Sequence, residues 1–175
     1  MLSNDIIRVI KPKIEELLLS FYGVEANFKK GFQSVKVGAN SDKVVYYHQL
    51  QSKNVGLVKR DSFYDSDTQT TIYNEIQVLE TTFQINSLVP KSSNITASDL
   101  VTYVRAIFTH LDFIDYLSAN NLSVYKPSTI RSGWFETDNG GYEDNPSFDV
   151  VFQHELITNA TSKSINQYDI NLERI

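Results

Sequence analysis

The pair His154-Glu155 is the place where this chain comes nearest to a catalytic motif. These are the first two residues of an HExxH zinc-protease pattern, in which two histidines one helical turn apart bind the metal. Thr158 stands where the second histidine is required, and the surrounding residues have the alternation of a strand. The sequence therefore predicts no zinc site here, and a surface or core role for the histidine.

Residues 65–69 (DSDTQ) have the spacing of carboxylates and amides that begins a calcium-binding loop. Such a loop needs a glycine at its sixth position and a bidentate glutamate at its twelfth. Thr70 and Ile76 occupy those two positions. We interpret the run as an acidic, solvent-facing turn.

The remaining chemistry-bearing residues are scattered. His48, His110 and His154 lie on different predicted elements, so a metal site or a histidine–aspartate dyad would require the fold to bring them together. Ser132 and Ser147 lack the context of a nucleophile elbow, and the seven glycines form no phosphate-binding pattern. Cysteine is absent, which excludes disulfides and thiolate chemistry. The sequence predicts no catalytic residue, metal or cofactor, and a protein that is not an enzyme.

Length and charge limit the possible partners. A chain of 175 residues predicts a single domain over residues 1–175, large enough to bury a core. With 16 basic and 21 acidic residues, it lacks the clustered cations that neutralise nucleic-acid phosphates. The N-terminus has no signal-peptide pattern, and no apolar run is long enough to span a membrane. We expect synthesis in the cytoplasm and no membrane partner.

Helical periodicity appears in two segments. Residues 4–22 carry an apolar stripe that ends at Gly23, and Pro12 is expected to bend the helix or divide it near Lys11. Residues 96–120 predict one long helix that begins with a capping box at Thr96 and Asp99. Its stripe comprises Leu100, Val104, Ile107, Leu111, Ile114 and Leu117. Ile107 and Leu111, at the middle of this stripe, are expected to be the most buried, and the smaller Val104 to anchor less.

Strand patterns fill much of the rest. Residues 43–52 and 70–85 are expected to form a long hairpin whose distal end lies within residues 53–69. The alternation of apolar residues in 70–85 changes phase near Val78-Leu79, which predicts a bulge or a change of partner. Further strands are expected at 24–28, 122–126, 129–137 and 146–158, with a turn at Asn139-Gly140. Residues 159–175 are expected to form an edge strand or an arm to a neighbouring subunit.

Aromatic residues gather at two expected turns. Phe63 and Tyr64 lie at the end of the first hairpin, and Trp134, Phe135 and Tyr142 flank the glycine-rich turn. Aromatic side chains on projecting hairpins are typical of contact surfaces, although ordinary core or rim packing explains them equally simply.

Three segments together resemble the tail terminator (tail completion, neck) proteins of long-tailed bacteriophages and related contractile particles. They are residues 64–85 (YDSDTQTTIYNEIQVLETTFQI), 96–127 (TASDLVTYVRAIFTHLDFIDYLSANNLSVYKP) and 130–156 (IRSGWFETDNGGYEDNPSFDVVFQHEL). The shared features are an aromatic-rich strand, a helix, and a late strand with the pattern Phe148-Asp149-Val150 after a polar turn.

The resemblance implies an α+β fold, with a mainly antiparallel sheet, helices packed on it and long projecting hairpins. It implies a homohexameric ring at the tail–head junction of the virion that caps the tail tube and stops its polymerisation. The implied partners are further copies of the chain, the tail tube, the sheath of contractile tails and the head-side connector. Two alternatives stay open: another phage connector or tube-like subunit, and an enzyme or ligand-binding domain.

In such a ring DNA passes through without being bound specifically, so the pore should be neutral to acidic. Carboxylates at the hairpin ends are candidates for part of that lining, although plain solvent-facing surface is the simpler interpretation. They are Asp61, Asp65, Asp67, Asp138 and Asp144.

Overall fold

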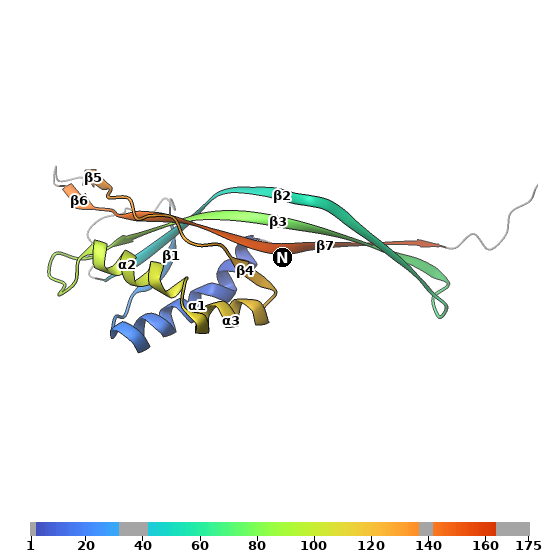
Figure 1. The fold of residues 1–175 in the computed structure, drawn as a ribbon, viewed down its shortest axis with the longest axis horizontal. Helices are drawn as coiled ribbons and strands as arrows, with labels where there is room; N and C mark the ends of the chain where they lie inside the picture. The colour runs from blue at the N-terminus through green and yellow to red at the C-terminus, as the bar shows by residue number, and fades with distance from the viewer. Residues whose placement is uncertain (1–2, 32–41, 137–141, 164–175) are drawn as a thin grey trace, which may run out of the picture.

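A five-stranded sheet with helices on one face forms the fold (Figure 1). The computed structural model describes residues 3–31, 42–136 and 142–163. The sheet has the order β1-β2-β3-β7-β4, and its neighbouring strands are antiparallel except for β1 and β2. The strands are β1 (Asn27–Lys30), β2 (Val44–Asp65), β3 (Thr70–Leu88), β4 (Leu122–Val124) and β7 (Ser147–Lys163). The predicted α+β class with a mainly antiparallel sheet is confirmed.

Three helices pack on this sheet: α1 (Ser3–Tyr22), α2 (Ala97–Ile107) and α3 (Leu111–Ala119). A separate pair of short strands, β5 (Trp134–Glu136) and β6 (Tyr142–Asp144), is antiparallel. The predicted turn at Asn139-Gly140 lies outside the described residues. One strand was expected over 129–137. In the described residues 129–136 only β5 forms, and the residues before it follow β7 through single contacts such as the bridge between Arg131 and Ser147.

The first helix is continuous, so of the two outcomes expected at Pro12 the division near Lys11 is wrong, while a bend stays a prediction. Pro12 lacks one backbone donor, but Ile10 and Ile14 on either side of it are fully buried, and their packing holds the helix together. Gly23 ends the helix as predicted. Its φ is +62°, and its N–H donates to the Leu19 carbonyl at 3.0 Å.

The expected single helix over 96–120 is also wrong, because the chain turns at Phe108–His110 between α2 and α3. The capping box at its start is confirmed: the Asp99 N–H donates to Thr96 Oγ1 at 3.1 Å, and the Thr96 N–H donates to Asp99 Oδ2 at 2.9 Å. The break occurs where the Phe108 ring enters the core.

The break between α2 and α3 exposes Leu111, a residue that was expected to be buried. Leu111 begins α3 at the surface with 67% of its area exposed, so its predicted central burial is wrong. Ile107 is buried at 1% exposure as expected, but Val104 is buried just as completely. Phe108 fills the position that the stripe assigned to Leu111, with its ring at 5.2–5.9 Å from those of Phe113, Phe148 and Phe152.

The long hairpin of β2 and β3 forms as predicted, but its two irregularities, at Leu50 and at residues 56–58, lie on the other strand. β3 pairs with β7 in one uninterrupted register from Thr70 to Asn86. On β2, the three residues Gly56, Leu57 and Val58 oppose the single residue Gln77. Gln77 stabilises this bulge, because its side-chain amide donates to the Val55 carbonyl at 3.2 Å and the Val78 carbonyl at 3.0 Å. The phase change therefore marks the place of the bulge, while the extra residues belong to β2.

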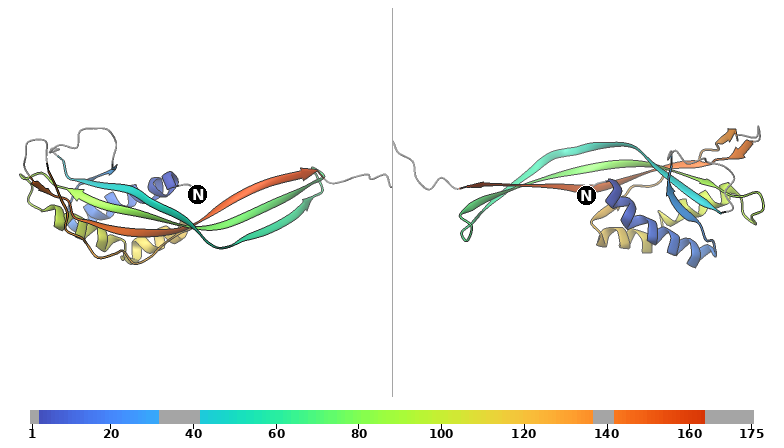
Figure 2. Two further views of the ribbon diagram at one scale, coloured as in Figure 1. Left: turned by 90° about the horizontal axis from the view of Figure 1, so that it is seen from above. Right: turned by 180° about the vertical axis from the view of Figure 1, so that it is seen from behind.

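The sheet continues well beyond the helices as a three-stranded arm (Figures 1 and 2). We define the arm as residues 55–65 of β2, 70–78 of β3 and 155–163 of β7. β4, the outermost strand of the body, ends its pairing at Leu122 and His154. Residues 159–163 of the expected tail thus extend β7, and residues 164–175 lie outside the described part of the chain.

Candidate assembly surface

The arm has no hydrophobic core of its own. None of its described side chains is buried, and even those of the central strand β3 are half-buried or exposed. A small sheet needs a covered hydrophobic face or a packed helix to be stable by itself. Because the helices end before the arm begins, no described helix covers either face of the arm.

The two faces of the arm carry different side chains, because side chains alternate along each strand. One face, continuous with the helix-free side of the sheet, carries six apolar side chains, interspersed with charged ones such as Lys59, Asp61 and Glu155. We call it the apolar face; it comprises Val55, Phe63, Ile72, Ile76, Val78 and Ile157. The opposite face includes the ion pair between Arg60 Nε and Glu75 Oε1 at 2.8 Å.

The bulge adds further apolar surface. Leu57 is 95% exposed and Val58 is 40% exposed. Sequence reasoning missed these two residues and Ile157, because apolar residues in a strand pattern are expected to face a core. A signal was present at Gly56, since a glycine inside a strand pattern often marks a bulge.

The aromatic residues singled out from the sequence lie at opposite ends of the molecule. Phe63 and Tyr64 are about half exposed near the tip of the arm, on its two different faces. Trp134, 69% exposed, lies on β5 at the far end of the body (Figure 1). Phe135 and Tyr142 occupy the same small hairpin, and their side chains lie outside what the structure describes. The two groups therefore belong to two separate surfaces.

The acidic candidates divide in the same way. Asp61, Asp65 and Asp67 lie at the tip of the arm, Asp144 lies on β6, and Asp138 lies outside the described residues. Asp65 closes the turn between β2 and β3: it accepts hydrogen bonds from Thr68 Oγ1 at 2.8 Å and the Asp67 N–H at 3.0 Å. These bonds, that of Thr68 first, lower the pKa of its carboxyl group. Asp65 thus has a structural role in the turn.

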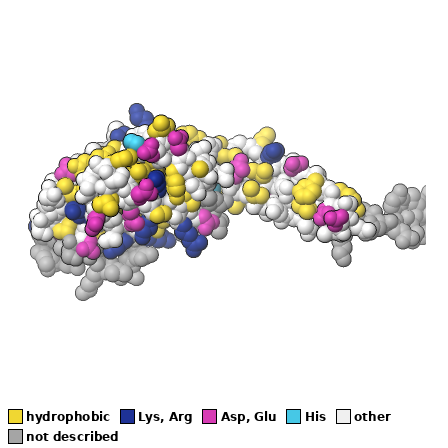
Figure 3. All heavy atoms as spheres, turned by 90° about the horizontal axis from the view of Figure 1, so that it is seen from below, with side chains coloured by type: hydrophobic (Ala, Val, Ile, Leu, Met, Phe, Trp, Pro, Cys, Tyr) yellow, Lys and Arg dark blue, Asp and Glu magenta, His cyan; other side chains and the backbone are white. Residues whose placement is uncertain are grey.

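Charge is distributed without a dominant basic area on the side where the helices lie. Figure 3 shows acidic and basic side chains intermixed over the body, and hydrophobic side chains continuing onto the arm. The face seen in Figure 3 therefore lacks the basic footprint of a nucleic-acid-binding protein, and the net charge of the chain is −5.

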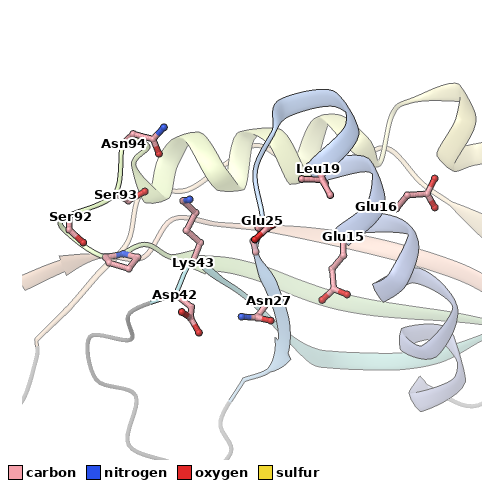
Figure 4. A pocket seen from close by; sticks show the side chains of 12 residues that line it. Glu15, Glu16, Leu19, Glu25, Asn27, Asp42, Lys43, Ser92, Ser93 and Asn94 are labelled. Carbon is pink, nitrogen blue, oxygen red and sulfur yellow. The ribbon is translucent and has the colours of Figure 1, made fainter.

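A hollow of about 840 Å³ lies beside α1 and β1 (Figure 4). Several carboxylates line it, but two of them have structural partners. Glu15 Oε1 accepts a hydrogen bond from the Phe28 N–H at 3.0 Å, and Glu16 Oε1 lies 2.6 Å from Lys13 Nζ. Among the described residues, no histidine borders the hollow. No group of three or more side chains suited to bind a metal ion occurs anywhere in the described part of the chain.

The three histidines stay apart in the fold. His48 lies on β2, and His110 caps α3 by accepting a hydrogen bond from the Asp112 N–H at 3.3 Å. His154 is buried where the body meets the arm, with Nε2 3.0 Å from Thr81 Oγ1. Its Nδ1 has no hydrogen-bond partner among the described residues. Burial lowers the pKa of His154 below its ordinary value of 6.5.

The His154 ring should make folding sensitive to acid. A histidine whose pKa is lower in the folded state binds a proton more readily in the unfolded state. Its contribution to the free energy of unfolding is therefore complete above pH 6.5 and decreases as the pH falls below that value. We expect His154→Gln to reduce the loss of stability between pH 7 and pH 5, measured by urea unfolding.

The half-buried His48 also has its pKa lowered by burial, so His48→Gln is the comparison, with a smaller expected effect. Equal pH dependence in wild type and His154→Gln would contradict this assignment.

No helix of the described residues is long and apolar enough to cross a membrane.

No curated protein matches the chain. A family model described as E217 gateway protein gp29 matches residues 5–164, which include the whole sheet and all of the three helices except the first two residues of α1. This match confirms the coarser part of the expectation, a structural phage protein of the connector or neck type, while the tail-terminator role stays a prediction. The chain belongs to the E217 gateway protein gp29 family, a family of phage head–tail gateway proteins.

Proposed function

We propose that this protein forms a homohexameric ring at the head–tail junction of a phage particle. The ring would cap the tail tube, end its polymerisation and present its other side to the head-side connector. Subunits that contact each other through two different surfaces form closed rings when the rotation between them closes. Phage DNA would pass through the ring without specific binding.

The observation that carries the proposal is the match of nearly the whole chain to a gateway family, joined with an arm that has no core. The arm places apolar side chains such as Ile76 and Ile157 on a face that no described residue of the same subunit covers. Exposed apolar patches of this kind typically mark protein–protein contacts. The arm and the small β5–β6 hairpin, at opposite ends, supply two different surfaces for such contacts.

A second candidate is a connector at another level of the neck, which the word "gateway" in the family description favours. Both candidates are structural and need no catalytic residue. A cryo-electron microscopy reconstruction of the particle distinguishes them, since the terminator ring contacts the end of the tail tube directly. A particle without a ring of this chain at the junction would contradict both.

The purified protein is expected to bind duplex DNA only weakly at physiological salt. DNA-binding proteins gain most of their non-specific affinity when their basic side chains release counterions from the phosphates. A chain with a net charge of −5 is not expected to gain affinity in this way. Fluorescence anisotropy with a labelled duplex measures this. Binding tighter than about micromolar would instead indicate a connector that holds DNA.

A further inference from the structure

The two outer edges of the arm are built differently. The arm is a three-stranded sheet of order β2-β3-β7, so β2 and β7 each leave one row of backbone groups without a neighbouring strand in the described part of the chain. An open edge is a template for pairing with another chain, and proteins usually protect it with bulges, charges or prolines.

The β2 edge has such protection. The bulge at residues 56–58 interrupts it, and the charged residues Lys59 and Arg60 follow at once. The Ser62 N–H donates to Asp61 Oδ1 at 2.9 Å, so a further donor is already satisfied. These features disfavour the addition of a strand to β2.

Between Glu155 and Lys163, the β7 edge has none of them. Residues 156–162 (LITNATS) contain no charged side chain and no proline, and their register with β3 shows no shift. β4 ends opposite His154, so no strand of the described chain covers the outer edge of β7 beyond that point.

Hydrogen bonds in the body show which residues of β7 face outward. On the side away from β3, the Val151 carbonyl accepts from the Tyr125 N–H at 3.0 Å, and the Asp149 carbonyl accepts from the Ser128 N–H at 2.9 Å. Backbone groups alternate between the two sides of a strand. Because the register is uninterrupted, Ile157, Asn159 and Thr161 direct their N–H and C=O groups to the open edge.

The sequence that follows β7 has the pattern of a strand. In residues 164–175 (SINQYDINLERI), Tyr168, Ile170 and Leu172 alternate with polar residues. The segment contains no glycine and no Asn-Gly or Asp-Gly pair, so it lacks the signals of a tight turn back onto its own β7. It starts at the tip of the arm, where Lys163 pairs with Thr70, and extended chain reaches roughly 3.3 Å per residue.

We propose that residues 164–175 of one copy add as a strand to the β7 edge, residues 155–163, of a neighbouring copy. The inference rests on the proposed ring and names the contact that links its subunits. The contact joins two different surfaces, the segment of one chain and the edge of the next, as ring closure requires. Main-chain hydrogen bonds supply affinity in such strand additions, and alternate side chains supply specificity.

Two single variants of the full chain test the two partners of the contact, the β7 edge and the segment 164–175, one at a time. Asn159→Pro removes an outward N–H that β3 does not use, and edge strands tolerate proline at such positions. Its matched control, Asn159→Ala, keeps the N–H. Ile170→Asp disrupts the apolar side of the segment but leaves the edge intact, and Ile170→Val is its control.

Native mass spectrometry over a range of concentrations should find association for the wild type and both controls. Asn159→Pro alone and Ile170→Asp alone should stay monomeric. Their mixture should form dimers, because the first retains a segment and the second retains an edge. In the associated wild type, hydrogen exchange at Ile157, Asn159 and Thr161 should slow by about tenfold or more relative to the monomer.

Three results would overturn the inference. The first is rapid exchange at these amides in the associated protein, or normal association of Asn159→Pro. The second is protection of the same amides in dilute monomer, which would mean that the segment pairs with its own chain. The third is a wild type that remains monomeric with unprotected amides at every concentration. In each of these cases, a ring of this chain seen at the head–tail junction of the particle would still support the proposed function. If the particle had no such ring, the proposed function would be wrong whatever the hydrogen-exchange data show.

Discussion

Phe152→Ala is expected to unfold the protein or leave it barely stable. The Phe152 side chain is fully buried, and its ring centroid lies 5.9 Å from those of both Phe83 and Phe108, so it joins β7 to β3 and to the end of α2. Truncating a buried phenylalanine typically costs about 3–5 kcal/mol, a large share of the roughly 5–15 kcal/mol that stabilises a domain. Urea unfolding followed by circular dichroism measures the change.

Leu111→Ala is the matched control, because the same helical pattern predicts burial there and the structure finds the side chain exposed. Its free energy of unfolding should change by no more than about 0.5 kcal/mol. Ile107→Ala, at a buried position of α2, should cost about 2–5 kcal/mol. If Phe152→Ala had the unfolding curve of the wild type, the aromatic core described above would be wrong.

Ile157→Asp is expected to abolish assembly while the monomer remains folded. The side chain is 56% exposed on the apolar face of the arm and pairs with Ile76 on β3, so a charge there does not disturb the core. In an interface the same charge would lose water, and the few hot-spot residues near the centre of an interface each contribute about 2 kcal/mol or more to binding. Size-exclusion chromatography with light scattering, together with a thermal melt, separates assembly from folding.

Thr158→Asp provides the comparison for this variant. It introduces the same charge at the next residue, which is also exposed but lies on the opposite face of the arm. If the apolar face is the interface, Thr158→Asp should assemble more readily than Ile157→Asp. Equal assembly of the two variants would show that the apolar face does not make the contact.

Local sequence patterns correctly predicted those features of the fold that depend only on residues close together in the chain. The capping box at Thr96 and Asp99 depends on groups three residues apart, and it forms as predicted. The end of α1 at Gly23 follows from the backbone freedom of one glycine. The buried face of β7, with Phe148, Val150 and Phe152, follows from the two-residue period of a strand.

The break between α2 and α3 was not predictable from periodicity. Leu111 and Ile114 continue the apolar spacing of α2, so a continuous helix satisfies the pattern as well as a broken one does. The difference arises because Phe108 packs against Phe148 and Phe152, which are far away in the sequence. Contacts of that kind carry no local signal.

The sequence by itself determined the class of fold, the long hairpin, the lack of local catalytic motifs, and the place of Phe63 and Tyr64 near the end of that hairpin. Only the tertiary structure decided which apolar strand residues are covered. The alternation around Ile157 differs little from that around Phe152, yet one side chain is exposed and the other fully buried. The reason is that burial depends on what packs over a strand, and the helices cover β7 only as far as the body extends.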